Sequence, residues 1–357
     1  MALDIKHYNF IDWMKALGMF LIVIGHVVGD PFNLYNQISQ PVYTKQLGVA
    51  FFVFITGWSL ANDSRPRLRV VFNRIFPIYF YGFVFALLIS LIFIFTKNDT
   101  NPSNYLPFFL GVNVLFNNFP ANPTTWYIGT YFHLLVFWYF FMQGRSVTIK
   151  HLLLALLVEN IVRSFLITSG NNFIAYMTLP NWLTIFLLGM YFRNKADLKS
   201  SNRVVFLLIA GWLLALIGWS FLADTIGFDQ SFPFRKAEGF DMDSPLALSL
   251  FVSGIYILNT WIFFEIARRL PFHKIISFLS RNTLIIFIAH MPVIYELSTY
   301  LLRLIDSVVI KKSLLILLLY FGLAVISEII QRRINIKSLR DLSWKVIGGF
   351  LVSRKSS

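Results

Sequence analysis

The stretch from residue 11 to residue 26 reads IDWMKALGMFLIVIGH, and it decides the kind of fold. It lies within an apolar segment at residues 10–29, which has the length that one α-helix needs to cross a bilayer. The segment is too long and too charged for a removable signal peptide, and it lacks a small-residue cleavage site. We therefore expect it to remain in the protein as a membrane helix.

The rest of the chain is equally apolar. Of its 357 residues, 57% are hydrophobic and 13% are charged, against about 25% charged residues in an ordinary soluble domain. This composition excludes a soluble enzyme. Backbone polar groups inside a bilayer must be paired within their own segment, so we predict an all-α polytopic membrane protein with about ten transmembrane helices. Their expected ranges are 10–29, 45–62, 75–96, 124–142, 150–168, 179–192, 204–223, 246–266, 275–299 and 313–330.

The basic residues predict an orientation. Lys and Arg number 31 against 17 Asp and Glu, which gives a net charge of +14. With a cytosolic N-terminus, 23 of the 31 basic residues lie on the cytosolic side, as the positive-inside rule requires. The sequence therefore predicts that both termini are cytosolic, and no nucleic acid partner is needed to explain the charge.

We expect residues 1–334 to form the transmembrane domain and residues 335–357 to form a basic cytosolic tail. Leu339, Leu342 and Val346 recur at helical spacing among basic residues in this tail. That pattern is typical of a helix that lies on the anionic inner leaflet of a membrane.

Four polar side chains follow the first helix: Asp12, Lys15, His26 and Asp30. At about 100° and 1.5 Å per residue, Lys15 and His26 are about 20° apart around the helix and about 16 Å apart along it. Polar groups within a span are candidate functional groups, and His26 could act as a base with Asp30 holding its other ring nitrogen. The alternatives are that Lys15 is an interfacial anchor and that His26 makes an interhelical hydrogen bond.

The chain contains no cysteine. Disulfides, cysteine-bound metals and a thiol nucleophile are therefore excluded, and we expect no metal cofactor. Any covalent intermediate must therefore form on a side chain other than cysteine.

Several motifs resemble the acyltransferase-3 family of bacterial membrane acyltransferases. In the first helix, Lys15 and His26 match its basic residue, ten intervening positions and histidine. In the late helix that ends at His290, Ser280 and Thr283 stand where the family usually has glycine and serine. The other matching stretches are FFVFITGWSL at 51–60, RIFPIY at 74–79, WYI at 126–128 and FLLGMY at 186–191.

The resemblance implies transfer of an acyl group, commonly acetyl, from cytosolic acyl-CoA to a hydroxyl of a cell-surface or lipid-linked glycan. It implies Lys15 and His26 as the central pair, with Arg74 and Tyr79 in a motif at the inner leaflet of the bacterial plasma membrane. Arg69 belongs to the same basic cluster, and arginine suits the phosphates of coenzyme A. The alternative for this cluster is that it only enforces topology.

Asp12, Trp126, Tyr127 and His290 are further candidates for substrate contact. Trp126 and Tyr127 could stack on a sugar, although aromatic residues are common at membrane interfaces. His290 precedes Met291 and Pro292, so a structural hydrogen bond is an equal alternative.

Two ion pairs and an alternative function complete the expectations. Glu265 with Arg269, and Glu328 with Arg332, have i,i+4 spacing and are expected to form surface salt bridges. A bundle with a polar stripe could also serve as a glycan exporter or flippase, or pass acyl groups to a separate enzyme. Binding of coenzyme A at the basic cytosolic site distinguishes the acyltransferase from the exporter.

Overall fold

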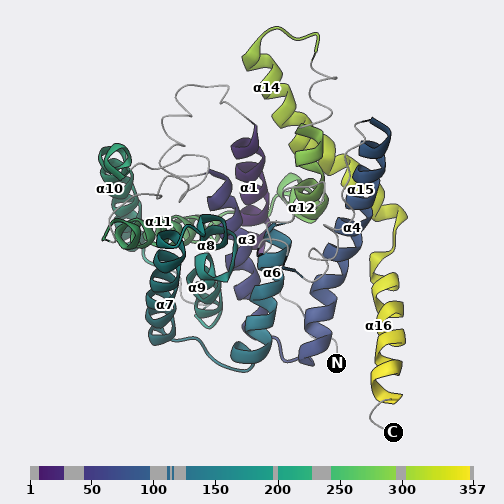
Figure 1. Ribbon diagram of the computed structural model, residues 1–357, viewed down its shortest axis with the longest axis horizontal. Coiled ribbons are helices and arrows are strands. Elements are labelled where there is room, and N and C mark those ends of the chain that lie inside the picture. Colours follow the sequence, from purple (N-terminus) through teal and green to yellow (C-terminus); the bar gives the residue numbers. More distant parts are fainter. Residues whose placement is uncertain are drawn as a thin grey trace.

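The computed structural model describes residues 8–27, 44–96, 111, 112, 115, 126–195, 200–226, 243–294 and 303–353 (Figure 1). All regular elements in these ranges are helices, which confirms the predicted all-α class. The first half contains α1 (Asn9–His26), α3 (Thr44–Leu60), α4 (Arg67–Thr96), α6 (Trp126–Phe137), η3 (Trp138–Met142), α7 (Ile149–Thr168) and α8 (Asn172–Met177). The second half contains η4 (Leu179–Asn181), α9 (Leu183–Arg193), α10 (Asn202–Ile226), α11 (Asp243–Ala267), α12 (Lys274–Pro292), α14 (Val308–Leu317), η6 (Leu318–Gly322), α15 (Leu323–Arg333) and α16 (Ile336–Ser353).

A helix lies over each of the ten ranges that the sequence predicts to be apolar spans. Among the described residues, five helices are long and apolar enough to cross a membrane by length and composition. They are Arg67–Phe85, Ile149–Thr168, Pro245–Ala267, Lys274–Pro292 and Val309–Arg333. The chain is thus a multi-pass helical protein, while the number of ten spans stays a prediction.

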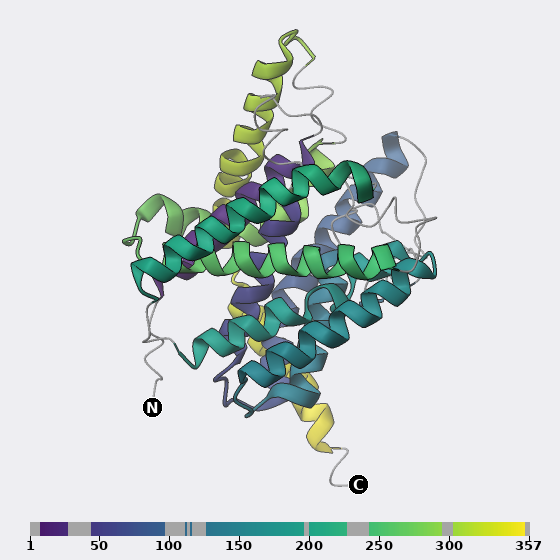
Figure 2. The same ribbon diagram turned by 90° about the vertical axis from the view of Figure 1, so that its left-hand side faces the viewer.

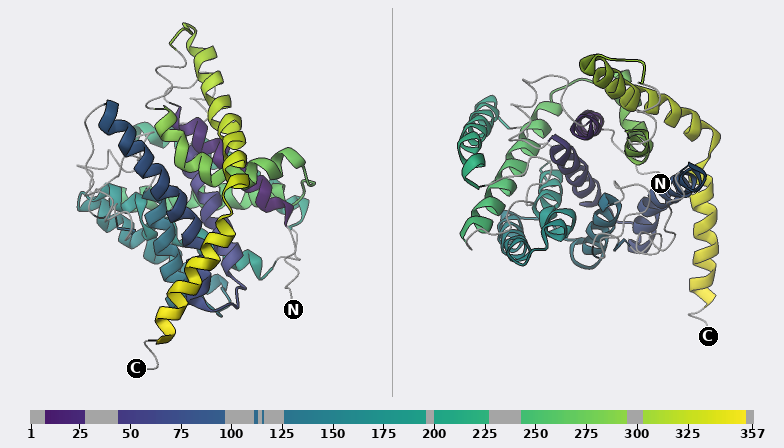
Figure 3. Two further views of the ribbon diagram at one scale, coloured as in Figure 1. Left: turned by 90° about the vertical axis from the view of Figure 1, so that its right-hand side faces the viewer. Right: turned by 45° about the horizontal axis from the view of Figure 1, so that its top comes forward.

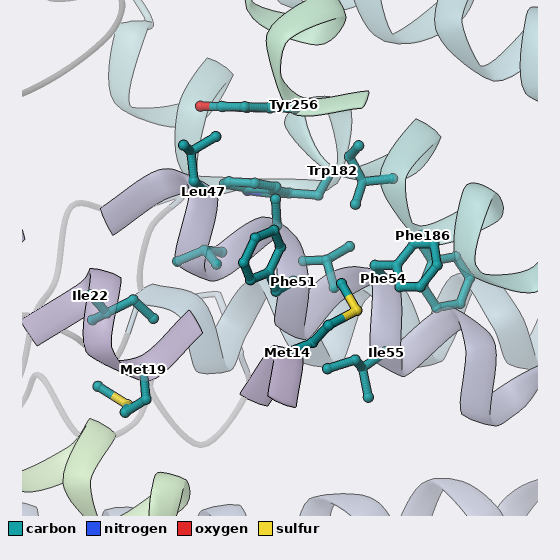
Figure 4. Close-up of a cluster of buried hydrophobic side chains, with 14 of the residues drawn as sticks. Met14, Met19, Ile22, Leu47, Phe51, Phe54, Ile55, Trp182, Phe186 and Tyr256 are labelled. Atoms are coloured by element: carbon teal, nitrogen blue, oxygen red, sulfur yellow. The ribbon is translucent and has the colours of Figure 1, made fainter. Parts of the chain in front are cut away.

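The first helix, α1, is the centre of the bundle. It packs against α3, α11 and α12, and the right-hand view of Figure 3 shows it encircled by other helices. The contact with α3 is close because two glycines face each other: a Cβ on Gly48 would lie 2.3 Å from the Gly18 carbonyl oxygen. Apolar side chains of α1 and α3, including Met14, Ile22 and Phe51, fill the surrounding core (Figure 4).

A second close crossing joins α3 to α9. A Cβ on Gly57 would lie 1.9 Å from the Phe186 carbonyl oxygen, and one on Gly189 would lie 2.0 Å from the Phe54 carbonyl oxygen. Both glycines belong to sequence motifs noted above, so the two motifs meet here. Beside this crossing, the Trp182 and Tyr256 rings stack with 5.3 Å between their centroids (Figure 4).

The charged residues that interrupt α7 form an internal network. Arg163 is fully buried and donates hydrogen bonds of 2.5–3.2 Å to side chains of α7, α11 and the η4 turn. Its acceptors are Glu159, Asn160, Asn181, Ser249 and Ser253. The other carboxylate oxygen of Glu159 accepts from the backbone N–H of Thr184 at 2.9 Å. Arg163 and Glu159 are both buried, and each is paired and hydrogen-bonded on several sides. Arg163 ties α7 to α11, and Glu159 ties α7 to α9. Figure 2 shows α11 crossing this side of the bundle beside α10.

The prediction that Glu265 and Arg269 form a surface salt bridge is wrong: the two residues do pair, but Glu265 is buried. The Glu265 side chain is fully buried, with Arg269 Nη1 at 2.7 Å and Arg268 Nη1 at 3.6 Å. Ser200 Oγ also donates to Glu265 at 2.7 Å. Ser200, in the segment before α10, therefore helps to cover the Glu265 carboxylate, while Arg269 stays partly exposed. The pair of Glu328 and Arg332 is exposed, as expected, at 3.1 Å.

The predicted tail forms α16, which packs along α4 (Figure 1). Arg69 of α4 forms an ion pair with Asp341 at 2.6 Å and lies over the Trp344 ring at 4.9 Å. Leu342 and Val346 are exposed, so α16 keeps an apolar face away from α4.

Candidate active site

A cavity of about 390 Å³ is lined by residues of α1, α3, α4, α6 and α12. Two cationic side chains, Lys15 and Arg74, line it. The remainder of its wall is mostly apolar, with Thr56, Ser59, Tyr127, Tyr131 and Thr283 as polar exceptions. A largely apolar cavity with a few convergent polar groups is the usual form of a small-molecule site, and this volume lies within the range of such sites.

Helix geometry directs Lys15 into this cavity. Asp12, one turn earlier on α1, and Arg74 from α4 both act electrostatically on the Lys15 ammonium group. Asp12 itself turns toward α12, where its carboxylate accepts a 2.7 Å hydrogen bond from Ser280 Oγ. The serine that replaces the usual glycine at position 280 therefore holds Asp12 and links α1 to α12.

Arg74 reaches the cavity from the first half of α4. Its Nη2 donates to the Ser59 carbonyl at 3.1 Å, near the end of α3. The other two residues predicted to bind the donor, Tyr79 and Arg69, do not line the cavity. Tyr79 follows the lining residue Ile78 without lining the cavity itself. Arg69 is engaged by Asp341 and Trp344 of α16.

His26 lies at the opposite end of α1 from Lys15. Its Nδ1 is 3.1 Å from Nε2 of His290 in α12, and the two ring centroids are 5.0 Å apart. The structure therefore pairs His26 with a histidine that lies 264 residues away in the sequence. Lys15 and His26 do not touch, since their separation along α1 is about 16 Å. The predicted partner Asp30 lies outside the described residues.

Phe287 lies between the cavity and the histidine pair. It lines the cavity, and its ring centroid is 6.0 Å from that of His290. Tyr127 lines the same wall and meets Phe287 edge to face at 5.6 Å. Its neighbour Trp126 packs instead against Tyr176 and Trp182, away from the cavity.

Sequence reasoning did not single out Phe287 or Thr56 as lining residues. Phe287 is three positions before His290, and this spacing puts both on one side of α12, so a helical-face argument could have found it. Thr56 is one step from Gly57, whose close crossing with α9 fixes the orientation of α3. No cluster of three or more His, Cys, Asp or Glu side chains within the described part of the chain could hold a metal ion.

The fold and the cavity together define a helical protein with several membrane-length apolar helices and a candidate small-molecule site lined by two cationic side chains. A family model described as an acyltransferase domain matches residues 8–330, which is most of the chain. The protein therefore belongs to the acyltransferase-3 family, and it is a membrane acyltransferase. No curated protein and no solved structure matches the chain.

Proposed function

We propose that the protein is an O-acyltransferase of the bacterial plasma membrane. It moves an acyl group, acetyl in the first instance, from cytosolic acyl-CoA to a hydroxyl of a cell-surface or lipid-linked glycan. The observation that carries this proposal is a cavity that joins Lys15 and Arg74 to an apolar wall ending at Phe287, beside the histidine pair. Family membership favours this function over the glycan exporter, which needs no acyl donor.

The two cations suit the donor. Coenzyme A carries phosphates, and the Arg74 guanidinium offers a fork of donors for phosphate oxygens, with Lys15 as a second positive charge. The apolar side of the cavity suits the thioester end of the donor, since it excludes water from the reacting carbonyl.

His26 supplies the base. It removes the proton from the acceptor hydroxyl as the hydroxyl oxygen attacks the thioester carbonyl carbon. The new C–O ester bond forms, the C–S bond breaks, and the proton on His26 passes to the thiolate of coenzyme A. In the covalent variant, the acyl group first moves to His26 and then to the acceptor, since the chain offers no thiol.

The proposed topology matches this reaction. Ten spans with both termini in the cytosol put Arg74 on the side where acyl-CoA is made. The same topology puts His26 toward the outer half of the membrane. Helix α16 then lies at the inner leaflet, with Leu342 and Val346 toward the lipid.

The direct test uses membranes that contain the full chain and radiolabelled acetyl-CoA. We expect the wild type to transfer label to an envelope glycan and His26→Ala to lose transfer. His151→Ala is the matched control, because His151 lies at the exposed start of α7. Mass spectrometry of envelope glycans with and without the protein should show a shift of one acyl group. Unchanged transfer by His26→Ala would exclude the proposed base.

A further inference from the structure

The hydrogen bonds of His290 determine where its ring proton lies. Its Nδ1 is 2.7 Å from the Phe287 carbonyl oxygen and 3.1 Å from the Ile286 carbonyl oxygen. A carbonyl oxygen can only accept a hydrogen bond, so Nδ1 of His290 must carry a hydrogen. In a neutral imidazole, the other nitrogen, Nε2, then has a lone pair and acts as an acceptor.

Both rings are best described as neutral. His290 is fully buried, and a buried cation is costly unless it is paired. A positive charge on His26 would also face the nearby charge of Lys45, which acts electrostatically on this ring. Two adjacent imidazolium ions at 3.1 Å would repel each other in addition.

The contact between the two rings then has only one possible direction. Since Nε2 of His290 is an acceptor, Nδ1 of His26 must be the donor across the 3.1 Å contact. His26 consequently has its hydrogen on Nδ1, and its Nε2 has a free lone pair. This is the form of histidine that can take a proton from a substrate through Nε2.

We propose that His290 is a positioning residue that fixes His26 in the Nδ1–H tautomer and thereby makes Nε2 of His26 the base. The inference rests on the proposed function, in which His26 removes the proton of the acceptor hydroxyl. In serine proteases a buried carboxylate holds the catalytic histidine in the same manner, and losing that partner's acceptor costs about 10⁴-fold in rate. His290 performs this task with a neutral ring whose own proton is held by two carbonyls of α12.

The first test reads the tautomer directly and requires no acyl transfer. The full chain is labelled with ¹⁵N-histidine, reconstituted in lipid, and compared with His26→Ala to assign the His26 signals among the six histidines. We expect a protonated Nδ1 and an unprotonated Nε2 at His26 in the wild type. His290→Met removes the ring acceptor and leaves the Ile22 backbone carbonyl, one turn earlier on α1, as the remaining partner of the His26 ring. We expect the share of the Nδ1–H form to fall in this variant. A wild-type His26 protonated on Nε2, or an unchanged His26 tautomer in His290→Met, would overturn the proposal.

The second test compares two substitutions of similar length in the acyl-transfer assay. Gln at position 290 can offer its side-chain oxygen to Nδ1 of His26, whereas Met cannot. We expect His290→Gln to keep kcat within about tenfold of the wild type and His290→Met to lose at least about a further tenfold. The KM for acetyl-CoA should stay unchanged in both, because neither Lys15 nor Arg74 is altered.

Equal losses in the two variants would show that His290 acts through packing and would contradict the proposal. Thermal unfolding of both variants in detergent identifies a general folding defect. If the wild type shows the expected tautomer but transfers no acyl group, the proposed function fails while the assignment of the tautomer holds. If acyl transfer is observed with the other tautomer, only the present inference fails.

Discussion

At the scale of single residues, Arg74 and Arg69 belong to one basic cluster in the sequence but have different surroundings in the structure. Arg74 lines the cavity next to Lys15, while Arg69 is paired with Asp341 of α16. The two arginines are five positions apart, and this spacing turns them to different sides of α4. A phosphate-bearing donor in the cavity should therefore depend on Arg74 far more than on Arg69.

Replacing Arg74 should weaken donor binding. We expect Arg74→Ala to raise the KM for acetyl-CoA about tenfold or more, because the loss of a charge-assisted hydrogen bond costs about 1.5–3 kcal/mol. Arg74→Lys should recover part of the loss, since lysine keeps the charge without the fork of donors. The measurement is the acetyl-CoA dependence of glycan labelling. Arg281→Ala, on an exposed part of α12, is the control and should leave KM unchanged.

The buried ion pair of Glu159 with Arg163 and the exposed pair of Glu328 with Arg332 both have i,i+4 spacing, and they should differ in their contribution to stability. Arg163→Ala leaves the carboxylate of Glu159 buried without its charge partner and should cost about 3–5 kcal/mol of unfolding free energy. Arg332→Ala removes an exposed partner of Glu328 and should cost about 1 kcal/mol or less. Thermal unfolding of both variants in the same detergent provides the comparison. Equal shifts in melting temperature would contradict the role assigned to the buried network.

At the scale of helices, the crossing of α3 and α9 depends on two residues without side chains. Gly57→Ala should lower the yield of folded protein severely, because the added methyl group would lie 1.9 Å from a backbone oxygen that cannot move alone. Gly254→Ala is the matched control on α11, where a Cβ meets no atom within 4 Å, and it should be neutral or slightly stabilising. Folded yield is measured by size-exclusion chromatography. A well-folded Gly57→Ala protein would show that the crossing is looser than described.

Helix periodicity explains which parts of the site the sequence could predict. The step from Lys15 to His26 is local to α1, so regular helix geometry suffices to put both on one face. The pairing of His26 with His290 depends on how α1 packs against α12, and nothing local in either helix encodes that choice. The burial of Glu265 has the same origin, because Ser200 from a distant segment covers it.

At the scale of the whole molecule, the ten helical ranges were predictable because the apolar segments are long and separated by charged or polar turns. The irregular elements were not predictable in this way. The π-helical turns Trp138–Met142 and Leu318–Gly322 lie within apolar runs that would also suit a regular helix. Each turn contacts another helix: the Tyr320 hydroxyl donates to the Ala16 carbonyl, and the Trp138 ring nitrogen donates to the Leu60 carbonyl.

The absence of cysteine makes the orientation of the whole molecule directly measurable, since a single introduced cysteine has no background. Asn171 and Asp306 are exposed at turns that the ten-span topology puts outside, whereas Ser146 and Ser201 are exposed at turns that it puts in the cytosol. In cells whose plasma membrane is intact but accessible from outside, a membrane-impermeant maleimide should label Asn171→Cys and Asp306→Cys. It should label Ser146→Cys and Ser201→Cys only after that membrane is permeabilised. The reversed pattern would put Arg74 on the outer side, away from cytosolic acyl-CoA, and would require a different donor route. A mixed pattern would exclude the ten-span topology.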